Sequence, residues 1–173
     1  MKKNVLWITQ TAIAIALLIV MQAVTASMGQ LVTGSIVNLI LIVSVMIFGL
    51  ASGLAVSALS PIFAKLLGIG PLWELIPFIM LGNMVLVLLW HLIAKRTFAK
   101  EPIPAVTAAV IAAVAKFLTL YVTIVLIAVP LLLNPAKTIS TIFSLPQLVT
   151  ALIGGAVALV ILPLLKKALP KRA

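Results

Sequence analysis

The sequence lacks cysteine altogether and has only two acidic residues, Glu74 and Glu101, and one histidine, His91. Without cysteine the chain forms no disulfide and no thiolate metal site. Two carboxylates and one imidazole are too few for a metal cluster, so we expect no metal and no other cofactor. No paired membrane carboxylates, no histidine beside a serine and no phosphate-binding loop occur, so we expect neither an enzyme nor ATP hydrolysis by this chain.

Charge is also scarce, since charged residues make up 8% of the chain, hydrophobic residues 65%, and the mean hydropathy is +1.41. Soluble domains have about 25% charged residues, so this chain has too few polar residues to cover a soluble globule. The composition therefore predicts an integral membrane protein. The net charge of +10 follows from the cationic loops of membrane proteins, and we expect no nucleic-acid partner.

Six apolar segments predict an all-α fold, a compact bundle of six transmembrane helices forming a single domain over residues 1–173. A transmembrane helix needs ~20 apolar residues. The first run follows Lys2 and Lys3 without a clear cleavage site, so we expect a retained helix rather than a signal peptide. Pro130 is expected to kink or end the fifth helix, with loops at 28–33 and 134–145. The expected helices are 4–27, 34–50, 53–67, 73–94, 104–133 and 146–165.

The basic residues predict the orientation of the chain. With six spans, three basic blocks and both termini fall on one side, which the positive-inside bias makes cytoplasmic. Lys65 and Lys137 then lie near the outer face, where interfacial lysines are common. The three blocks are Lys2 and Lys3; Lys95, Arg96 and Lys100; and Lys166, Lys167, Lys171 and Arg172.

Lys116 lies well inside an apolar run and is the main candidate for a functional residue. A charged side chain within a membrane is costly and needs a carbonyl, a carboxylate or water as partner. Two alternatives stay open, namely pairing with Glu74 inside the bundle or contact with a bound substrate. Other polar or aromatic residues are expected in the outer half of the bundle and form the rest of the predicted site: Gln30, Asn38, Trp73, Glu74, Asn83, Tyr121 and Gln147.

Several of these residues also have a purely structural explanation. Trp73 is typical of interfacial anchoring, and Glu74 in a first helical turn is favoured by the helix dipole. Asn83 is suited to bridging two helices. Ala12 and Ala16 form a small stripe one helical turn apart, which suits either packing within the bundle or docking of a partner helix.

These features together resemble the substrate-binding S components of energy-coupling factor (ECF) transporters. The resemblance covers essentially the whole chain and rests on six short helices, cytoplasmic termini and the Ala12/Ala16 pair in the first helix. The stretches that look similar are Gly49–Gly53, Ile76–Asn83 and Leu145–Gly155. Each motif is weak alone, and their order and spacing carry the resemblance.

The resemblance implies a multi-pass protein of the prokaryotic cell membrane that captures a vitamin or related micronutrient from outside. It implies as partners a transmembrane coupling protein, contacted by Ala12 and Ala16, and two cytoplasmic ATPases. ATP turnover would topple the S component so that its site faces the cytoplasm. The ligand would lie in the outer half beneath the 28–33 loop. Because Lys116 suits an anionic group, pantothenate is the first expected substrate and cobalamin the second.

Two other classes compete with this interpretation. A structural or assembly subunit without a ligand would have Lys116 satisfied within the bundle and would tolerate its neutral replacement. A small secondary transporter would be expected to show inverted repeats or several intramembrane ionisable groups, and the sequence shows neither. An intramembrane enzyme is the weakest alternative, because no nucleophile lies beside a base.

Overall fold

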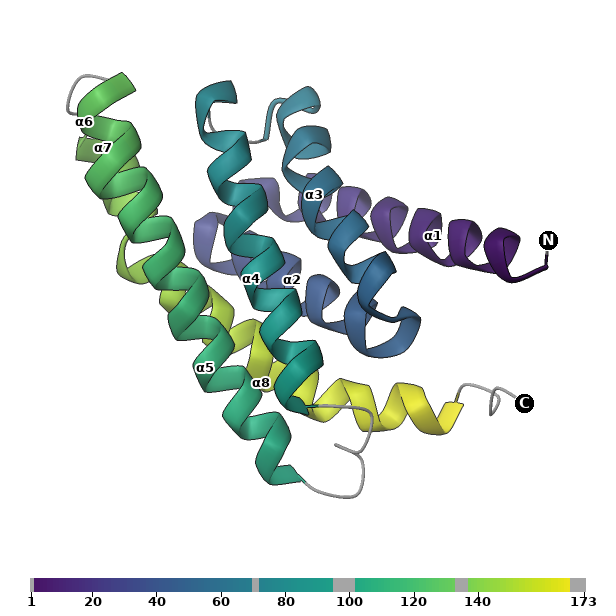
Figure 1. The fold of residues 1–173 in the computed structure, drawn as a ribbon. Coiled ribbons are helices and arrows are strands. Elements are labelled where there is room, and N and C mark those ends of the chain that lie inside the picture. The colour runs from purple at the N-terminus through teal and green to yellow at the C-terminus, as the bar shows by residue number, and fades with distance from the viewer. Residues whose placement is uncertain (1, 70–71, 95–101, 133–136, 169–173) are drawn as a thin grey trace.

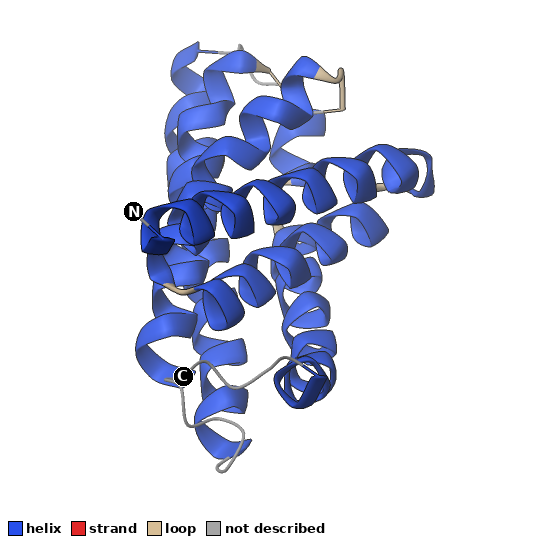
Figure 2. Cartoon of the chain, turned by 90° about the vertical axis from the view of Figure 1, so that its right-hand side faces the viewer, coloured by secondary structure: helices blue, strands red, loops and turns tan. Residues whose placement is uncertain are grey.

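The computed structural model describes residues 2–69, 72–94, 102–132 and 137–168. Within these ranges the chain is helical almost throughout and contains no strand (Figures 1 and 2), which confirms the predicted all-α class. In Figure 1 the first turn of α1 and the last turns of α8 lie on the same side of the molecule.

The first two helices are joined more tightly than the sequence predicted. Helix α1 spans Lys2–Thr25, continues as a 3₁₀ turn over Ala26–Met28, and is followed by α2 over Gln30–Val43. Gly29, with a φ of +87°, reverses the chain within one residue, a conformation that costs glycine little. The loop predicted over 28–33 is therefore wrong, because Gln30 and Thr33 already belong to α2.

The middle of the chain follows the predicted order with shifted ends. A π-helical segment over Ser44–Phe48 closes α2, and α3 runs over Leu50–Leu66 with Pro61 inside it. After a 3₁₀ turn over Trp73–Leu75, helix α4 runs over Ile76–Ala94.

The fifth predicted helix is one continuous helical path of three parts. Helix α5 covers Pro102–Leu120, a π-helical segment covers Tyr121–Ala128, and α6 covers Val129–Leu132. Pro130 does not end this path. Its ring would clash with the Leu126 carbonyl in a regular α-helix, and the wider π turns lie immediately before it.

The final part of the chain contains a helix that the sequence did not predict. Helix α7 covers Lys137–Ile142, inside the segment 134–145 that was expected to be a loop. Helix α8 covers Leu145–Ala168, about three residues beyond the predicted end, and contains Pro163.

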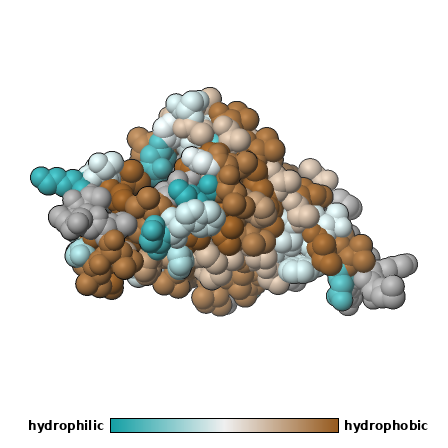
Figure 3. Space-filling view, turned by 90° about the horizontal axis from the view of Figure 1, so that it is seen from above, coloured by the Kyte–Doolittle hydropathy of each residue, from teal (hydrophilic) through white to brown (hydrophobic). Residues whose placement is uncertain are grey.

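Among the described residues, five helical segments are long and apolar enough to cross a membrane, namely Asn4–Met28, Gln30–Phe48, Trp73–Ala94, Ile103–Leu132 and Lys137–Ala168. Helix α3, with 17 residues, is the shorter apolar helix. Large hydrophobic side chains such as Val20, Leu131 and Val160 are exposed, and brown hydrophobic residues cover much of the surface in Figure 3. This surface suits lipid rather than water. The basic block at Lys95, Arg96 and Lys100 lies outside the described residues, as do Lys171 and Arg172.

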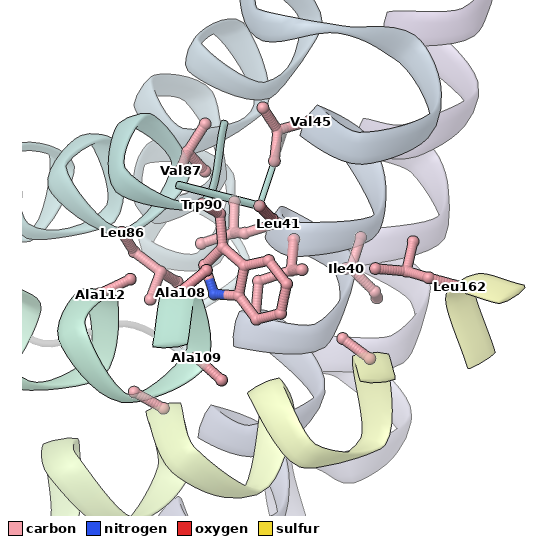
Figure 4. Packing of buried hydrophobic residues seen from close by; sticks show 14 of the residues in the cluster. Ile40, Leu41, Val45, Leu86, Val87, Trp90, Ala108, Ala109, Ala112 and Leu162 are labelled. Atoms are coloured by element: carbon pink, nitrogen blue, oxygen red, sulfur yellow. The ribbon is translucent and has the colours of Figure 1, made fainter. Parts of the chain in front are cut away.

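The hydrophobic core centres on Trp90 of α4, which is completely buried (Figure 4). Ala108, Ala109 and Ala112 give α5 a smooth buried face in the same cluster, and α8 presents Gly155 close to the Trp90 ring. Small residues allow close helix approach in lipid, where packing replaces the hydrophobic effect between helices. The core thus fixes α4, α5 and α8 against one another, and these three helices carry much of the site described next.

Candidate ligand-binding site

A cavity of about 280 Å³ lies between the helices and is lined near three connections, by Gln30 at the start of α2, Ile69 just after α3 and Phe143 between α7 and α8. Residues from α1, α2, α3, α4, α5, α7 and α8 line it. Gln30 is exposed and Lys116 is 3% exposed, so the cavity runs from the surface to the bundle interior. Its polar lining residues are Gln22, Gln30, Thr33, Asn38, Ser60, Asn83, Lys116 and Gln147.

Lys116 forms the inner polar centre of this cavity. Its Nζ donates hydrogen bonds to Asn38 Oδ1 of α2 at 2.5 Å and to Asn83 Oδ1 of α4 at 2.8 Å. Hydrogen bonds from an ionised donor are shorter and roughly twice as strong as neutral ones. The two amide oxygens therefore stabilise the ammonium where water is scarce, although neither of them neutralises its charge.

A second layer of hydrogen bonds orients the two asparagines. Asn38 Nδ2 donates to Thr150 Oγ1 of α8 at 3.3 Å, and Asn83 Nδ2 donates to Ser60 Oγ of α3 at 3.5 Å. Because each Nδ2 is engaged away from the lysine, each Oδ1 is directed toward it. The network joins α2, α3, α4, α5 and α8, so the position of the ammonium depends on the whole bundle.

Two glycines allow the helices to come close enough for these contacts. A Cβ on Gly154 of α8 would lie 2.7 Å from Asn38 Cβ and 2.7 Å from the Ser35 carbonyl oxygen of α2. A Cβ on Gly82 of α4 would lie 2.7 Å from the Leu120 side chain of α5. Small residues at both crossings therefore place Asn38 and Asn83 within reach of Lys116.

Two polar groups at the cavity have unused hydrogen-bonding capacity. An ammonium carries three donors, and the described residues accept two of those of Lys116. Gln22 of α1 is 7% exposed, and its Oε1 is buried without a hydrogen-bond partner among the described residues. Buried polar groups without partners are rare in native structures. Lys116 thus offers a cationic donor and Gln22 a neutral acceptor inside the cavity.

Five of the residues predicted from the sequence meet at this cavity, namely Gln30, Asn38, Asn83, Lys116 and Gln147. Gln147 is also fixed, since its Nε2 donates to the Ile142 carbonyl at 3.3 Å. The other three predicted residues do not line it. Trp73 and Glu74 are exposed in the 3₁₀ turn before α4, and Tyr121 packs against Phe117 with the ring centroids 5.7 Å apart.

The possible Glu74–Lys116 pair does not form, because the lysine is bonded to two asparagines and Glu74 lies at the surface. Tyr121 was misplaced for a geometric reason. In an α-helix a residue five positions after Lys116 lies about 140° around the axis, whereas Leu120, four positions on, stays near its face. Leu120 accordingly lines the cavity.

Sequence reasoning missed three of the polar lining residues, namely Gln22, Thr33 and Ser60. The signal for Gln22 was present, because it belongs to a stripe that recurs every three or four residues and faces the bundle. The buried residues of this stripe are Thr11, Ala14, Leu18, Gln22 and Thr25. Ala12 and Ala16 lie off this stripe and are exposed, so they do not pack within the bundle.

Removing one asparagine is expected to destabilise the protein. In Asn83→Leu the buried ammonium loses an acceptor and Ser60 loses its donor, so the midpoint of thermal unfolding in detergent should fall. A buried polar group left unpaired costs about 1–3 kcal/mol, more when charged. The unfolding midpoint of Asn83→Asp should fall less than that of Asn83→Leu, because a carboxylate accepts the same hydrogen bond and neutralises the lysine. Equal midpoints for Asn83→Leu and the unmodified chain would show that Lys116 does not need this partner.

Comparison with family models, with curated proteins and with solved structures finds no match to this chain.

Proposed function

We propose that this protein is the substrate-capture subunit of an importer, an S component of the ECF type, which binds a small micronutrient from outside the cell. The observation that supports this most is the buried, unneutralised Lys116 in a polar cavity that reaches the surface. Ionisable residues within membrane proteins are costly and mark substrate pathways. A mostly apolar cavity with a few convergent polar groups is the usual form of a small-molecule site.

The proposed topology has six spans, with α3 as the sixth, and both termini in the cytoplasm of a prokaryotic cell. Six antiparallel spans put the α1–α2, α3–α4 and α7–α8 connections on the outer side. The cavity lies toward this end, so substrate would enter from outside. Lys166 and Lys167 at the end of α8 would lie on the cytoplasmic side, as the positive-inside bias favours.

Two observations favour substrate capture over the structural-subunit alternative. A bundle that needed Lys116 only for packing would be expected to satisfy the side chain completely, yet one donor of Lys116 and the Oε1 of Gln22 are without a partner among the described residues. A cavity of about 280 Å³ also lies beside them. Retaining both costs stability, and ligand binding gives this cost a function.

Delivery of the substrate would need a partner, because the chain has no motif for ATP hydrolysis. In the proposal, a transmembrane coupling protein docks on the exposed Ala12/Ala16 stripe of α1 and two cytoplasmic ATPases drive toppling. The smooth stripe suits close approach of a partner helix within lipid. Exposed apolar neighbours such as Ile13 and Leu17 suit a surface that rotates through lipid.

The double variant Ala12→Leu/Ala16→Leu tests this docking. Two large side chains should separate the helix surfaces and abolish both uptake and co-purification of the ATPases from membranes of the host. Ligand binding should be retained, because neither alanine lines the cavity. The matched control is Ala156→Leu, an equally small exposed residue of α8. Normal uptake by the double variant, or equal loss in the control, would remove the docking role of α1.

A further inference from the structure

The cavity also indicates which class of substrate it accepts, an inference that rests on the proposed function and deepens it. Its charge is the first clue. Lys116 is the only ionisable residue among the described residues that line it. The two partners of its ammonium are neutral amide oxygens, so one positive charge remains without a counter-ion. A single negative charge on the ligand would neutralise it, whereas a cationic ligand would add repulsion in a poorly solvated space.

The second clue is the number and kind of free hydrogen-bonding groups. The third donor of Lys116 requires an acceptor, which a carboxylate oxygen supplies. The Oε1 of Gln22 requires a donor, because a carbonyl oxygen only accepts. Gln22 comes from α1 and Lys116 from α5, so one molecule that contacts both would lie between these two helices. The ligand therefore needs an acceptor of negative charge and, at a separate position, an N–H or O–H group.

The third clue is size. Ligand sites have volumes of about 300–1,000 Å³, so the cavity of about 280 Å³ lies just below this range. This size favours a compact organic acid such as pantothenate and disfavours a corrinoid such as cobalamin. Val37, Pro61, Ile79 and Leu120 supply apolar walls around the ligand carbon skeleton.

We infer that the cavity binds a small organic monocarboxylate that also carries a hydroxyl, amide or amine hydrogen. The carboxylate accepts from Lys116 between Asn38 and Asn83, and the donor group bonds to Gln22 nearer α1. An ion with two or more charges fits less well, because a single ammonium neutralises one of them. The two contacts are separable, since they come from different helices and different ends of the ligand.

Matched pairs of compounds test the charge on the ligand. The purified chain is titrated calorimetrically with compact carboxylic acids and with the neutral counterpart of each, such as pantothenate with pantothenol, nicotinate with nicotinamide, and biotin with biotinamide. Small molecules that co-purify with the chain are identified by mass spectrometry in the same experiment. An acid should bind, and its neutral counterpart should bind at least about tenfold more weakly.

The Gln22→Met variant tests the second contact. This variant retains the side-chain length and removes the acceptor. The affinity for a hydroxyl-bearing acid should therefore fall by about tenfold. The same acid without that hydroxyl should bind the variant and the unmodified chain equally. If the variant binds both acids more weakly to the same extent, or binds both as tightly as the unmodified chain does, the assignment of Gln22 is overturned.

The remaining outcomes separate the two proposals. A neutral or cationic compound that binds as tightly as the acids, or a co-purified molecule without a carboxylate, overturns the substrate class and leaves substrate capture standing. Binding of no compound, together with no co-purified molecule, overturns the proposed function itself.

Discussion

Replacing Lys116 by methionine is expected to lower the affinity for the captured substrate by at least about tenfold, which corresponds to about 1.4 kcal/mol. Methionine has a similar length and occupies the same space, but it has no charge and no donor. Removing one partner of a buried, hydrogen-bonded charge pair typically costs about 2–5 kcal/mol, so the affinity should fall by more than tenfold. Isothermal titration calorimetry of the purified variant measures the effect directly.

The fold of Lys116→Met should survive, because removing the costly buried charge offsets the loss of the donor to Asn38 Oδ1 and Asn83 Oδ1. A thermal unfolding scan without ligand checks this. Lys137→Met is the matched control, because it removes the same charge from an exposed lysine that does not line the cavity. Unchanged affinity in Lys116→Met would make the lysine a structural residue and favour the assembly-subunit alternative.

Gly154→Val is expected to abolish ligand binding and to lower the unfolding midpoint. Even a bare Cβ would lie 2.7 Å from the Ser35 carbonyl oxygen, which is backbone and cannot rotate away. Helix α8 would have to move from α2, which would carry Thr150 away from Asn38 and disturb the acceptor of Lys116. Overpacking of this kind costs about 1–3 kcal/mol, occasionally more.

The neighbouring glycine provides the control for this prediction. A Cβ on Gly155 would meet Ala109 Cβ at 3.2 Å, a milder contact than the 2.7 Å approach to Ser35 at Gly154. Gly155→Ala should therefore have a small effect, because the clash is offset by a gain in helix propensity of about 1 kcal/mol. If Gly154→Val and Gly155→Ala reduce ligand binding and the unfolding midpoint to a similar extent, the contact of Gly154 with α2 does not explain the effect.

The sequence was most informative where a residue contradicted its surroundings. Lys116 in an apolar run could be singled out without a structure, because the cost of a charge in lipid makes such a residue rare. Asn38, Asn83 and Gln147 followed from the same reasoning on uncharged polar residues in apolar helices, and all three line the cavity. The segment order of the fold was equally readable, since apolar length decides which segments can span a membrane.

The partners of each side chain could not be predicted in the same way. Hydropathy gives the depth of a residue along a helix but not its direction around the axis, because lipid-facing and buried sides are both apolar. Tyr121 was therefore placed in the site on depth alone, and Gln22 was missed although its stripe was visible. The choice between Glu74 and other partners for Lys116 depended on the α2–α8 and α4–α5 crossings. Gly154 and Gly82 permit these two crossings, but the sequence does not say which helix packs against each glycine.

The turns were predicted least well, for a related reason. Gly29, Gln30 and Thr33 suit a loop, yet Gly29 alone makes the reversal and Thr33 Oγ1 donates to the Thr25 carbonyl at 2.7 Å. Helix α7 occupies part of the expected loop over 134–145. Helices of six residues are not stable alone, so their formation depends on packing that the sequence does not display.

The most direct test of substrate capture is to purify the full chain in detergent, identify any small molecule that co-purifies by mass spectrometry, and titrate that compound back onto the emptied protein by calorimetry. Substrate capture predicts one compact organic acid, bound at one site per chain and lost in Lys116→Met but not in Lys137→Met. If no compound co-purifies and no vitamin-sized acid, neutral compound or cation binds, the protein is not a substrate-capture subunit.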